Sequence, residues 1–463
     1  MKAMKIKLLG ALVVTAFIAA NAQAAQTLFK NVNVFNGTDN QLYSNLNVLV
    51  DGNKITSISA ELPKVDDTAT LIDGTGKTLM PGLIESHTHL NLQYMQGGYN
   101  TLENRSWQEV GAMAAGAARH ILMDGYTTIR DLGTLNAGFR NAADAGLVDS
   151  PRIYTAGTVI GQTAGHGDWR LVSNVSEAQF EVSNINRLGF IKNTDGADEV
   201  LKAARNNYAQ YADFTKLTIS GGIFSDKDPL FTTQMNEAEL KAAVEAADAW
   251  DSYVTAHVFN DKDVRRAMKA GLKMFEHTPY ITDDTAKLMA KNNIMTNPQF
   301  GTVSPKFPVE AVFGPKGTPT RDKADMAFDE ARELPNIIKR NGVKAVFGVD
   351  VVTVDPYMTR KQRDYEIFRW GELFDNFYTL KALTSYGGEL AALTGKGNPY
   401  PGKIGVVEVG AYADLLLVDG NPLEDLSVIG AQADIFSVPN RDEGAIDGMK
   451  IIMKDGKIYK NTL

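Results

Sequence analysis

The chain contains no cysteine among its 463 residues. This absence excludes disulfide bonds and every zinc site that depends on cysteine ligands. Any metal ion that the protein binds must therefore be held by His, Asp, Glu or a modified Lys. Histidine is also scarce, with six residues in the whole chain, so the position of each one is informative.

Basic tracts are absent as well. Acidic residues outnumber basic ones by 55 to 47, and the formal net charge is −8. Binding to nucleic acid depends on clusters of Lys and Arg that neutralise phosphates. We therefore expect no nucleic-acid partner.

Long apolar runs are missing beyond the N-terminus. Residues 1–24 begin with Lys2, Lys5 and Lys7, continue with LLGALVVTAFIAA and end with Ala22-Gln23-Ala24. This order is typical of a secretory signal peptide, and the apolar run is short for a membrane span. We expect cleavage near Ala24, which removes three lysines and lowers the net charge from −8 to −11. The protein is then exported without a membrane anchor, with the periplasm favoured over the medium; the alternative is a retained N-terminal anchor.

The two ends of the remaining chain share one pattern. Short alternating stretches flank Asp-Gly turns in LNVLVDGNKITSISA and again in MKIIMKDGKIYKN. Asp-Gly between alternating apolar residues is typical of a β-hairpin. We predict that residues 25–80 and 398–463 join into one small β-sandwich domain.

Residues 81–397 instead alternate short apolar strands with helical stretches. The eight strand candidates are LMPGLIESHTHL, YTTIRDLG, RIYTAGTVI, DFTKLTIS, SYVTAHVF, LKMFEHTP, NIMTNPQF and KAVFGVD. Such alternation predicts a parallel sheet, and eight units favour an α/β fold with a (β/α)₈ TIM-like barrel over a doubly wound open sheet. Long connections follow the third and seventh candidates, over 161–199 and 301–340. The second of them contains the helical stretch KADMAFDEARELPNIIKR.

Residues able to bind a metal stand at the ends of these strands. His87 and His89 are two apart in one strand, so they project from the same face. His257, His277 and Asp350 end three other candidates. Each has a structural explanation when taken alone, such as a half-buried polar pair or a turn residue.

Lys216 lies inside the fourth candidate strand, where a lysine is costly to bury unless it is paired or neutralised. A salt bridge alone would explain it. In a barrel, however, the strand ends meet at one mouth, and Lys216 would lie there with the four histidines and Asp350. Imidazole and carboxylate groups suit zinc and related ions. The sequence therefore predicts a metal site at the mouth.

These motifs together resemble the amidohydrolase superfamily, and within it the imidazolonepropionase-like and prolidase-like branch. The similar stretches are PGLIESHTHL, DGYTTIRDLG, TAGHGD, DFTKLTISGGIFS, VTAHVF, FEHTPY, VFGVD and AYADLLLVDGNPLEDL, in the order of the family. They cover nearly all of the chain after residue 24. Glu85 departs from the pattern, because many relatives have Asp there.

The resemblance implies a role for each of the six residues. His87, His89 and Asp350 would bind the more buried of two divalent ions, and His257 and His277 would bind the second. Lys216 would be carboxylated and would bridge both ions. We expect zinc, although manganese, cobalt and iron accept the same ligands.

The reaction that the resemblance implies is hydrolysis of an amide or peptide-like C–N bond in a small molecule, such as a dipeptide or an N-acyl amino acid. Two ions about 3.5–4 Å apart would share a hydroxide that attacks the carbonyl. Asp350 would act as general base and then acid. His166, in the glycine-rich TAGHGD, would contact the substrate, unless it is only a surface-loop histidine.

Other functions remain open on the sequence. A mononuclear deaminase or cyclic-amide hydrolase would lack the bridging lysine, and an esterase or lactonase would use the same hydroxide on another bond. A periplasmic binding protein without catalysis is the non-enzyme alternative. Because relatives are often multimeric, the resemblance also suggests a homo-oligomer.

Overall fold

The structure is a computed structural model that describes residues 26–94, 99–171, 183–225, 227–351, 356–440 and 442–463. The predicted signal peptide lies outside these residues, so its cleavage and the export of the protein stay predictions. Within the described residues, no helix has both the length and the apolar character of a membrane span.

One sheet combines strands from both ends of the chain. Its strands are β1 (Gln26–Val34), β2 (Tyr43–Asp51), β3 (Lys54–Ser59), β4 (Thr70–Asp73), β5 (Thr78–Pro81), β15 (Leu415–Val418), β16 (Met449–Lys454) and β17 (Lys457–Asn461). They lie in the order β17-β16-β15-β5-β1-β2-β3, and β4 also pairs with β1. The two chain ends meet where β5 pairs antiparallel with β15.

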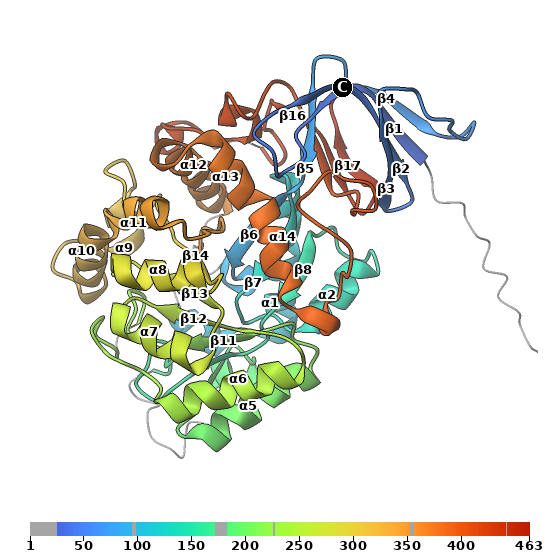
Figure 1. Cartoon of the computed structure of the whole chain (residues 1–463). Helices are drawn as coiled ribbons and strands as arrows, with labels where there is room; N and C mark the ends of the chain where they lie inside the picture. Colours follow the sequence, from blue (N-terminus) through green and yellow to red (C-terminus); the bar gives the residue numbers. More distant parts are fainter. Residues whose placement is uncertain (1–25, 95–98, 172–182, 226, 352–355, 441) are drawn as a thin grey trace, which may run out of the picture.

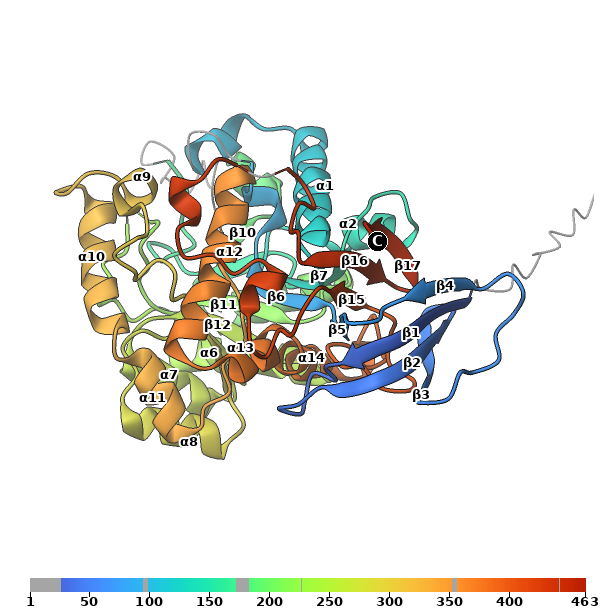
Figure 2. The same ribbon diagram turned by 90° about the horizontal axis from the view of Figure 1, so that it is seen from above.

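The predicted Asp-Gly turn joins β2 and β3, which pair antiparallel. Gly52 has φ +60°, which glycine adopts without the steric cost that a Cβ would add. Buried apolar residues, among them Phe29, Val48, Leu415 and Ile451, form a separate core for this β-rich part. It lies to one side of the rest of the molecule in both views (Figures 1 and 2). The sandwich arrangement and the domain limits stay predictions.

The rest of the chain alternates strands and helices, as predicted. Its strands are β6 (Leu83–Thr88), β7 (Tyr126–Asp131), β8 (Arg152–Thr155), β9 (Val159–Gly161), β10 (Ile191–Asn193), β11 (Thr215–Thr218), β12 (Val254–Val258), β13 (Met274–His277) and β14 (Met295–Asn297). They form a sheet β6-β7-β8 and a sheet β10-β9-β11-β12-β13-β14, and every pairing in both is parallel. The arrangement is TIM-barrel-like.

Helices follow most of these strands and cover them (Figure 1). They are α1 (Trp107–Met123), α2 (Ala137–Asp144), α4 (Asn184–Arg187), α5 (Ala197–Ala209), α6 (Glu237–Ala249), α7 (Asp261–Ala270), α8 (Asp283–Lys291), α9 (Val309–Phe313), α10 (Pro319–Ala331), α11 (Leu334–Asn341), α12 (Pro356–Leu373), α13 (Asn376–Leu383) and α14 (Ser385–Ala392). Helix α6 begins with a capping box between Asn236 and Glu239, which satisfies backbone N–H groups at its start. Apolar side chains such as Ile121, Ala204, Leu240 and Val264 form the main core between helices and strands.

Two strand candidates differ from the prediction. The third divides into β8 and β9 around Gly157, whose φ is +70°; β8 pairs with β7, and β9 pairs with β11. The eighth, KAVFGVD, forms only an isolated parallel bridge from Ala345 to Thr296, and Val351, the residue after it, forms another to Thr88. Asp350 has φ +52° there, so its backbone is left-handed rather than extended.

The segment after β14 corrects another prediction. KADMAFDEARELPNIIKR is not one helix but parts of α10 and α11, which are separated at Arg332 and Glu333. Pro335 lies in the first turn of α11. Proline lacks a backbone N–H and clashes with the preceding turn, so it is tolerated at a helix start and not in its interior.

Candidate metal centre

Three of the predicted histidines point toward one carboxylate. His87 and Thr88 are the last two residues of β6, His89 follows that strand, and His277 is the last residue of β13. His87 Nε2 lies 3.3 Å from Asp350 Oδ1, and His89 Nε2 lies 3.5 Å from the same oxygen. His277 Nε2 lies 3.9 Å from Asp350 Oδ2. The structure thus brings together four predicted residues from three separate segments.

The second ring nitrogen of each of these histidines, Nδ1, faces an oxygen atom of the surrounding protein. The partners are Asn297 Oδ1 at 3.1 Å for His87, the Gly133 carbonyl oxygen at 3.3 Å for His89, and Gln299 Oε1 at 2.7 Å for His277. Metal-binding histidines are oriented in this way, with one nitrogen bonded to the protein and the other left for the ion.

His257 and Lys216 lie on the adjoining strands β12 and β11. The rings of His257 and His277 have centroids 4.6 Å apart. His257 Nε2 lies 3.2 Å from the Gly221 carbonyl oxygen, so Nδ1 is the nitrogen left for another partner. Lys216 is only 3% exposed, and its electrostatic neighbours include Asp350 and Glu276. All six predicted residues are therefore at or beside one cluster.

Three histidines of this cluster, His87, His257 and His277, have pKa values that burial lowers. Burial lowers the pKa of His87, lowers that of His257 well below its usual value, and lowers that of His277 to about 3. At neutral pH these imidazoles are uncharged and keep a lone pair, as metal ligation requires. Within the described residues, ligand atoms of His87, His277 and Asp350 all lie within 4.8 Å of one another. The donor set fits a divalent ion.

The backbone is strained at two of these positions. His277 has φ +70° and Asp350 has φ +52°, in the left-handed region that residues with a Cβ rarely adopt. The Asp350 N–H donates to the His87 carbonyl oxygen at 2.9 Å, which fixes Asp350 next to β6. Strain of this kind persists where the surrounding structure holds it, and it concentrates at functional sites.

A buried ion pair lies behind His87. Glu276 Oε2 is 3.1 Å from His87 Nδ1, and Glu276 Oε1 is 2.9 Å from Arg130 Nη1. Tyr253 and the Ser86 carbonyl accept further hydrogen bonds from Arg130. Burial raises the pKa of Glu276, but Arg130, His87 and Lys216 outweigh it and hold that pKa well below its usual value. Glu276 is therefore a buried anion that orients His87.

Glu85, the departure from the family pattern, links two parts of the cluster. Its Oε1 accepts hydrogen bonds from the backbone N–H groups of His87 and Val349, both at 3.0 Å. These bonds tie β6 to the residue before Asp350. Burial raises the pKa of Glu85 to about 8. The longer side chain thus supports two predicted ligands and is not in conflict with them.

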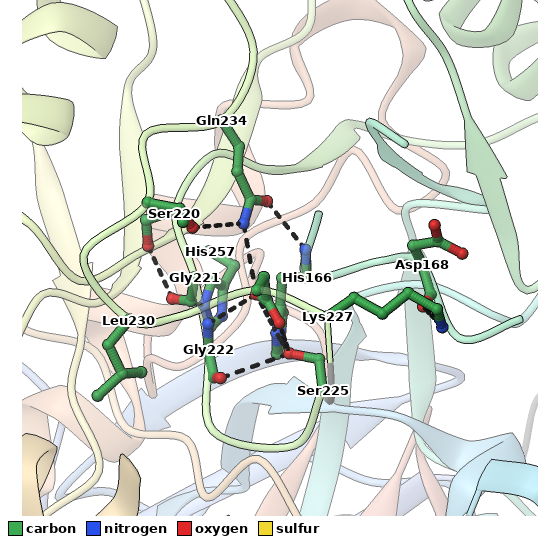
Figure 3. A network of polar contacts seen from close by, with 12 residues as sticks. His166, Asp168, Ser220, Gly221, Gly222, Ser225, Lys227, Leu230, Gln234 and His257 are labelled. Carbon is green, nitrogen blue, oxygen red and sulfur yellow. Dashed lines mark hydrogen bonds and ion pairs between the residues drawn. The ribbon is translucent and has the colours of Figure 1, made fainter. Parts of the chain in front are cut away.

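His166 lies next to His257 and belongs to a polar network (Figure 3). The two rings stack with centroids 3.9 Å apart and an interplanar angle of 18°. His166 Nδ1 lies 2.9 Å from Ser225 Oγ and 3.5 Å from Asp228 Oδ2. Gln234 Oε1 accepts the His166 backbone N–H at 2.9 Å. His166 is thus a fixed residue beside the cluster and not a free surface-loop histidine.

A pocket opens in front of the cluster. His166, His257, His277, Gln299 and Asp350 line one side of it. Apolar residues from the β11–α6 loop and from helices α9 and α10 line the other, namely Ile223, Phe224, Phe313, Ala327 and Phe328. The pocket is therefore lined by polar residues of the cluster together with apolar residues, as is usual for a small-molecule site.

Sequence reasoning missed several residues of this site. Arg130 and Glu276 are charged residues inside strand candidates, and the argument applied to Lys216 would have marked them as a buried pair. Asn297 ends β14 and Gln299 follows two residues later, which is a weaker signal. Asp228 had no signal, and Ser225, although it ends the stretch DFTKLTISGGIFS, had none that pointed to His166, because these contacts span about sixty residues of sequence.

Comparison with known proteins gives consistent matches. A family model described as "Amidohydrolase family" matches residues 78–449. Ochratoxinase of Aspergillus niger is 27% identical over 423 residues, which are 87% of this chain and 79% of that protein. A solved amidohydrolase structure has 28% identity and a TM-score of 0.82, and covers 95% of this chain and 100% of its own. A prolidase in complex with N-methylphosphonate-L-proline has 26% identity and a TM-score of 0.80, with the same coverage.

Proposed function

Because the chain belongs to the amidohydrolase family, we propose that it is a metal-dependent hydrolase that cleaves an amide or peptide-like C–N bond in a small molecule. The observation that carries this proposal is the set of three imidazoles whose Nε2 atoms face Asp350 and whose Nδ1 atoms are bonded to the protein. The similarity to a prolidase favours a dipeptide or an N-acyl amino acid as substrate.

Two divalent ions, which we expect to be zinc, complete this site. His87, His89 and Asp350 would hold the more buried ion, and His257 and His277 would hold the second. When bound, the ions would polarise the carbonyl and make water nucleophilic near neutral pH. The neutral imidazoles and the buried carboxylates supply the donor types that such ions take.

Lys216 is proposed to be carboxylated and to bridge the two ions. Burial lowers its pKa to about 8, so a larger fraction of its amine is uncharged than in an ordinary lysine. The uncharged amine is the form that adds CO₂. Addition of CO₂ to the amine forms an N–C bond and releases one proton to solvent, and the resulting carbamate anion removes the cost of a buried ammonium group beside the proposed metal site.

The chain's own groups have separate tasks in the proposed reaction. The Asp350 carboxylate takes the proton of the attacking water and passes it to the leaving nitrogen. Burial raises the pKa of Asp350, but its contacts with His87, His89 and His277 outweigh burial and the net shift is downward, so Asp350 is ionised at neutral pH. His166 contacts the substrate, and the apolar pocket wall excludes water from part of it.

We further propose that the two parallel sheets contribute to one barrel of eight strands, in which β8 and β9 together count as the third strand, β10 lies outside the barrel and residues 345–351 are the eighth strand. The bridges from Ala345 to Thr296 and from Val351 to Thr88 connect this segment to β14 and β6. The Ser86 N–H also donates to the Phe347 carbonyl oxygen at 2.9 Å. In this arrangement all six predicted residues lie at the carboxyl-terminal mouth, where barrels carry their active sites.

The test is hydrolysis of a panel of dipeptides and N-acyl amino acids by protein without residues 1–24, supplied with zinc. We expect release of free amine that a chelator abolishes and that added zinc restores. Esters and lactones on the same panel test the alternative bonds. Faster cleavage of an ester or lactone than of every amide would contradict the proposed C–N specificity.

A further inference from the structure

His166 has an unusual degree of support for a residue outside the metal ligands. One face of its ring stacks on His257. The other side is close to Gly222, where a Cβ would lie 2.2 Å from His166 Nδ1. The ring is therefore confined between a metal-site histidine and a glycine backbone, and only its in-plane orientation is left to be fixed.

Asp228 is the buried group that can fix this orientation. Its side chain is 0% exposed. It accepts hydrogen bonds from the Gly222 N–H at 2.9 Å, from Gln234 Nε2 at 3.3 Å and from Ser225 Oγ, and it lies 3.5 Å from His166 Nδ1. Every one of these partners belongs to the loop beside His166 or to His166 itself.

The Ser225 hydroxyl sets which ring nitrogen carries hydrogen. A serine has one O–H to donate, and its acceptors here are the Asp228 carboxylate and, at 3.4 Å, the Gly222 carbonyl oxygen. Ser225 Oγ is then an acceptor for His166, so Nδ1 must be the donor across 2.9 Å. Within the described residues nothing is hydrogen-bonded to His166 Nε2, which leaves that atom for a polar group of the substrate in the pocket.

Lys323 holds this loop in place from helix α10. Its ammonium group donates to the carbonyl oxygens of Gly222, Ser225 and Asp228 at 3.1, 2.6 and 2.7 Å. It also lies 3.6 Å from the Asp228 carboxylate, whose charge it balances. The same helix supplies Phe328 to the apolar pocket wall, so the loop and the wall are fixed relative to each other.

We propose that Asp228 is a positioning residue for substrate binding, which acts through Ser225 to keep His166 protonated on Nδ1 and to direct Nε2 toward the substrate. This inference rests on the proposed function. A purely structural role for Asp228 would instead affect folding and metal content, with no specific dependence on His166.

The kinetic test is a double-mutant cycle of Asp228→Asn and His166→Ala, using the dipeptide or N-acyl amino acid that the wild type hydrolyses fastest. We expect Asp228→Asn to raise KM about 10-fold or more while kcat changes little, because loss of uniform substrate binding has that signature. In the His166→Ala background, Asp228→Asn should have no further effect. Equal losses in both backgrounds would overturn the proposal.

A matched control is Asp213→Asn. Asp213 is also buried, pairs with Arg140 and precedes β11 at the opposite end from the pocket. The Asp213→Asn variant should leave KM unchanged in the folded fraction. A KM increase in this variant equal to that of Asp228→Asn would show that loss of any buried carboxylate gives the effect, and would contradict the proposal.

A measurement without substrate tests the role of Asp228 even if the proposed hydrolase activity is absent. Nitrogen-15 spectra of the six histidines, in zinc-loaded protein, report which ring nitrogen carries hydrogen, and His166→Ala identifies the His166 signals. We expect protonation on Nδ1 in the wild type and a changed pattern in Asp228→Asn. An unchanged pattern overturns the role of Asp228, whereas a wild type that cleaves no amide overturns the proposed function alone.

Discussion

Two histidines of the pocket region each have a buried carboxylate on their Nδ1 side, and they differ in what their Nε2 atoms face. Behind His87 lies Glu276, and His87 Nε2 faces Asp350. Behind His166 lies Asp228, and His166 Nε2 has no hydrogen-bond partner within the described residues. The same arrangement, a buried anion behind an imidazole, is thus found at the proposed metal ligand His87 and at the proposed substrate contact His166.

The two carboxylates are balanced by different cations. Glu276 pairs with Arg130 in the interior, where both side chains are almost fully buried. Asp228 lies near Lys323, whose ammonium group is mainly bonded to loop carbonyls. A change at Glu276 should therefore affect metal binding and stability, whereas a change at Asp228 should affect substrate binding.

The largest effect is expected for Asp350→Asn, on the His87 side of the comparison. The amide cannot accept the proton of the attacking water, so kcat should fall by about 10²–10⁴-fold. Metal content should stay largely intact, because the histidines and Lys216 remain. Steady-state kinetics and elemental analysis on the same sample measure both. Near-normal kcat would remove Asp350 from the proposed proton transfer.

Glu276→Gln should weaken metal binding. The variant loses the anion behind His87 and leaves Arg130 buried without its partner. We expect metal affinity to fall by about 10–100-fold, as for other residues that orient a ligand. Unpairing a buried charge also costs about 3–5 kcal/mol of unfolding free energy. Chelator competition and urea unfolding measure the two effects. Unchanged metal affinity would contradict the proposed difference, in which Glu276 supports metal binding and Asp228 supports substrate binding.

Glu366 is a third buried carboxylate, but unlike Glu276 and Asp228 it has no histidine among its hydrogen-bond partners in the described residues. It accepts hydrogen bonds from the N–H groups of Phe300 and Gly301 and from Trp370. Burial is the largest influence and raises its pKa from 4.5 to about 7. In contrast to Glu276 and Asp228, it has too little compensating charge to offset burial.

This difference predicts a pH dependence of stability. Between pH 4.5 and about 7 the folded state binds more protons at Glu366 than the unfolded state does. The Glu366 contribution to the unfolding free energy therefore falls as pH rises through this interval and is constant above it, with a total change of about 3 kcal/mol. Glu366→Gln lacks this contribution, so the stability difference between wild type and variant should shift by that amount between pH 4.5 and 8 in urea unfolding. A difference that is the same at both pH values would contradict the raised pKa.

Much of the site could be predicted because a parallel α/β sheet places the ends of its strands together. His87, His277 and Asp350 are hundreds of residues apart in some pairs, yet strand position alone predicted that they meet. The alternation of strands and helices was likewise visible. The break between α10 and α11 was overlooked although Pro335 indicates it.

The remaining features depend on tertiary structure. The left-handed backbone of Asp350 lies at the end of the eighth strand candidate, KAVFGVD, where the sequence predicted an extended residue. Asp228 and Ser225 lie in a loop without a regular pattern, so their approach to His166 follows only from the folded loop. The clustering of the candidate metal ligands was therefore predicted from the sequence, whereas most of the residues that contact and orient them were not.

We propose that Lys216 bridges two metal ions, and the metal content per chain shows whether it does. Elemental analysis should be made on the wild type and on Lys216→Ala, purified in parallel and supplied with zinc and bicarbonate. We expect close to two ions per chain in the wild type and a clear decrease in the variant. One ion per chain in both proteins would contradict it, since Lys216 would then have a structural role and the site would be mononuclear.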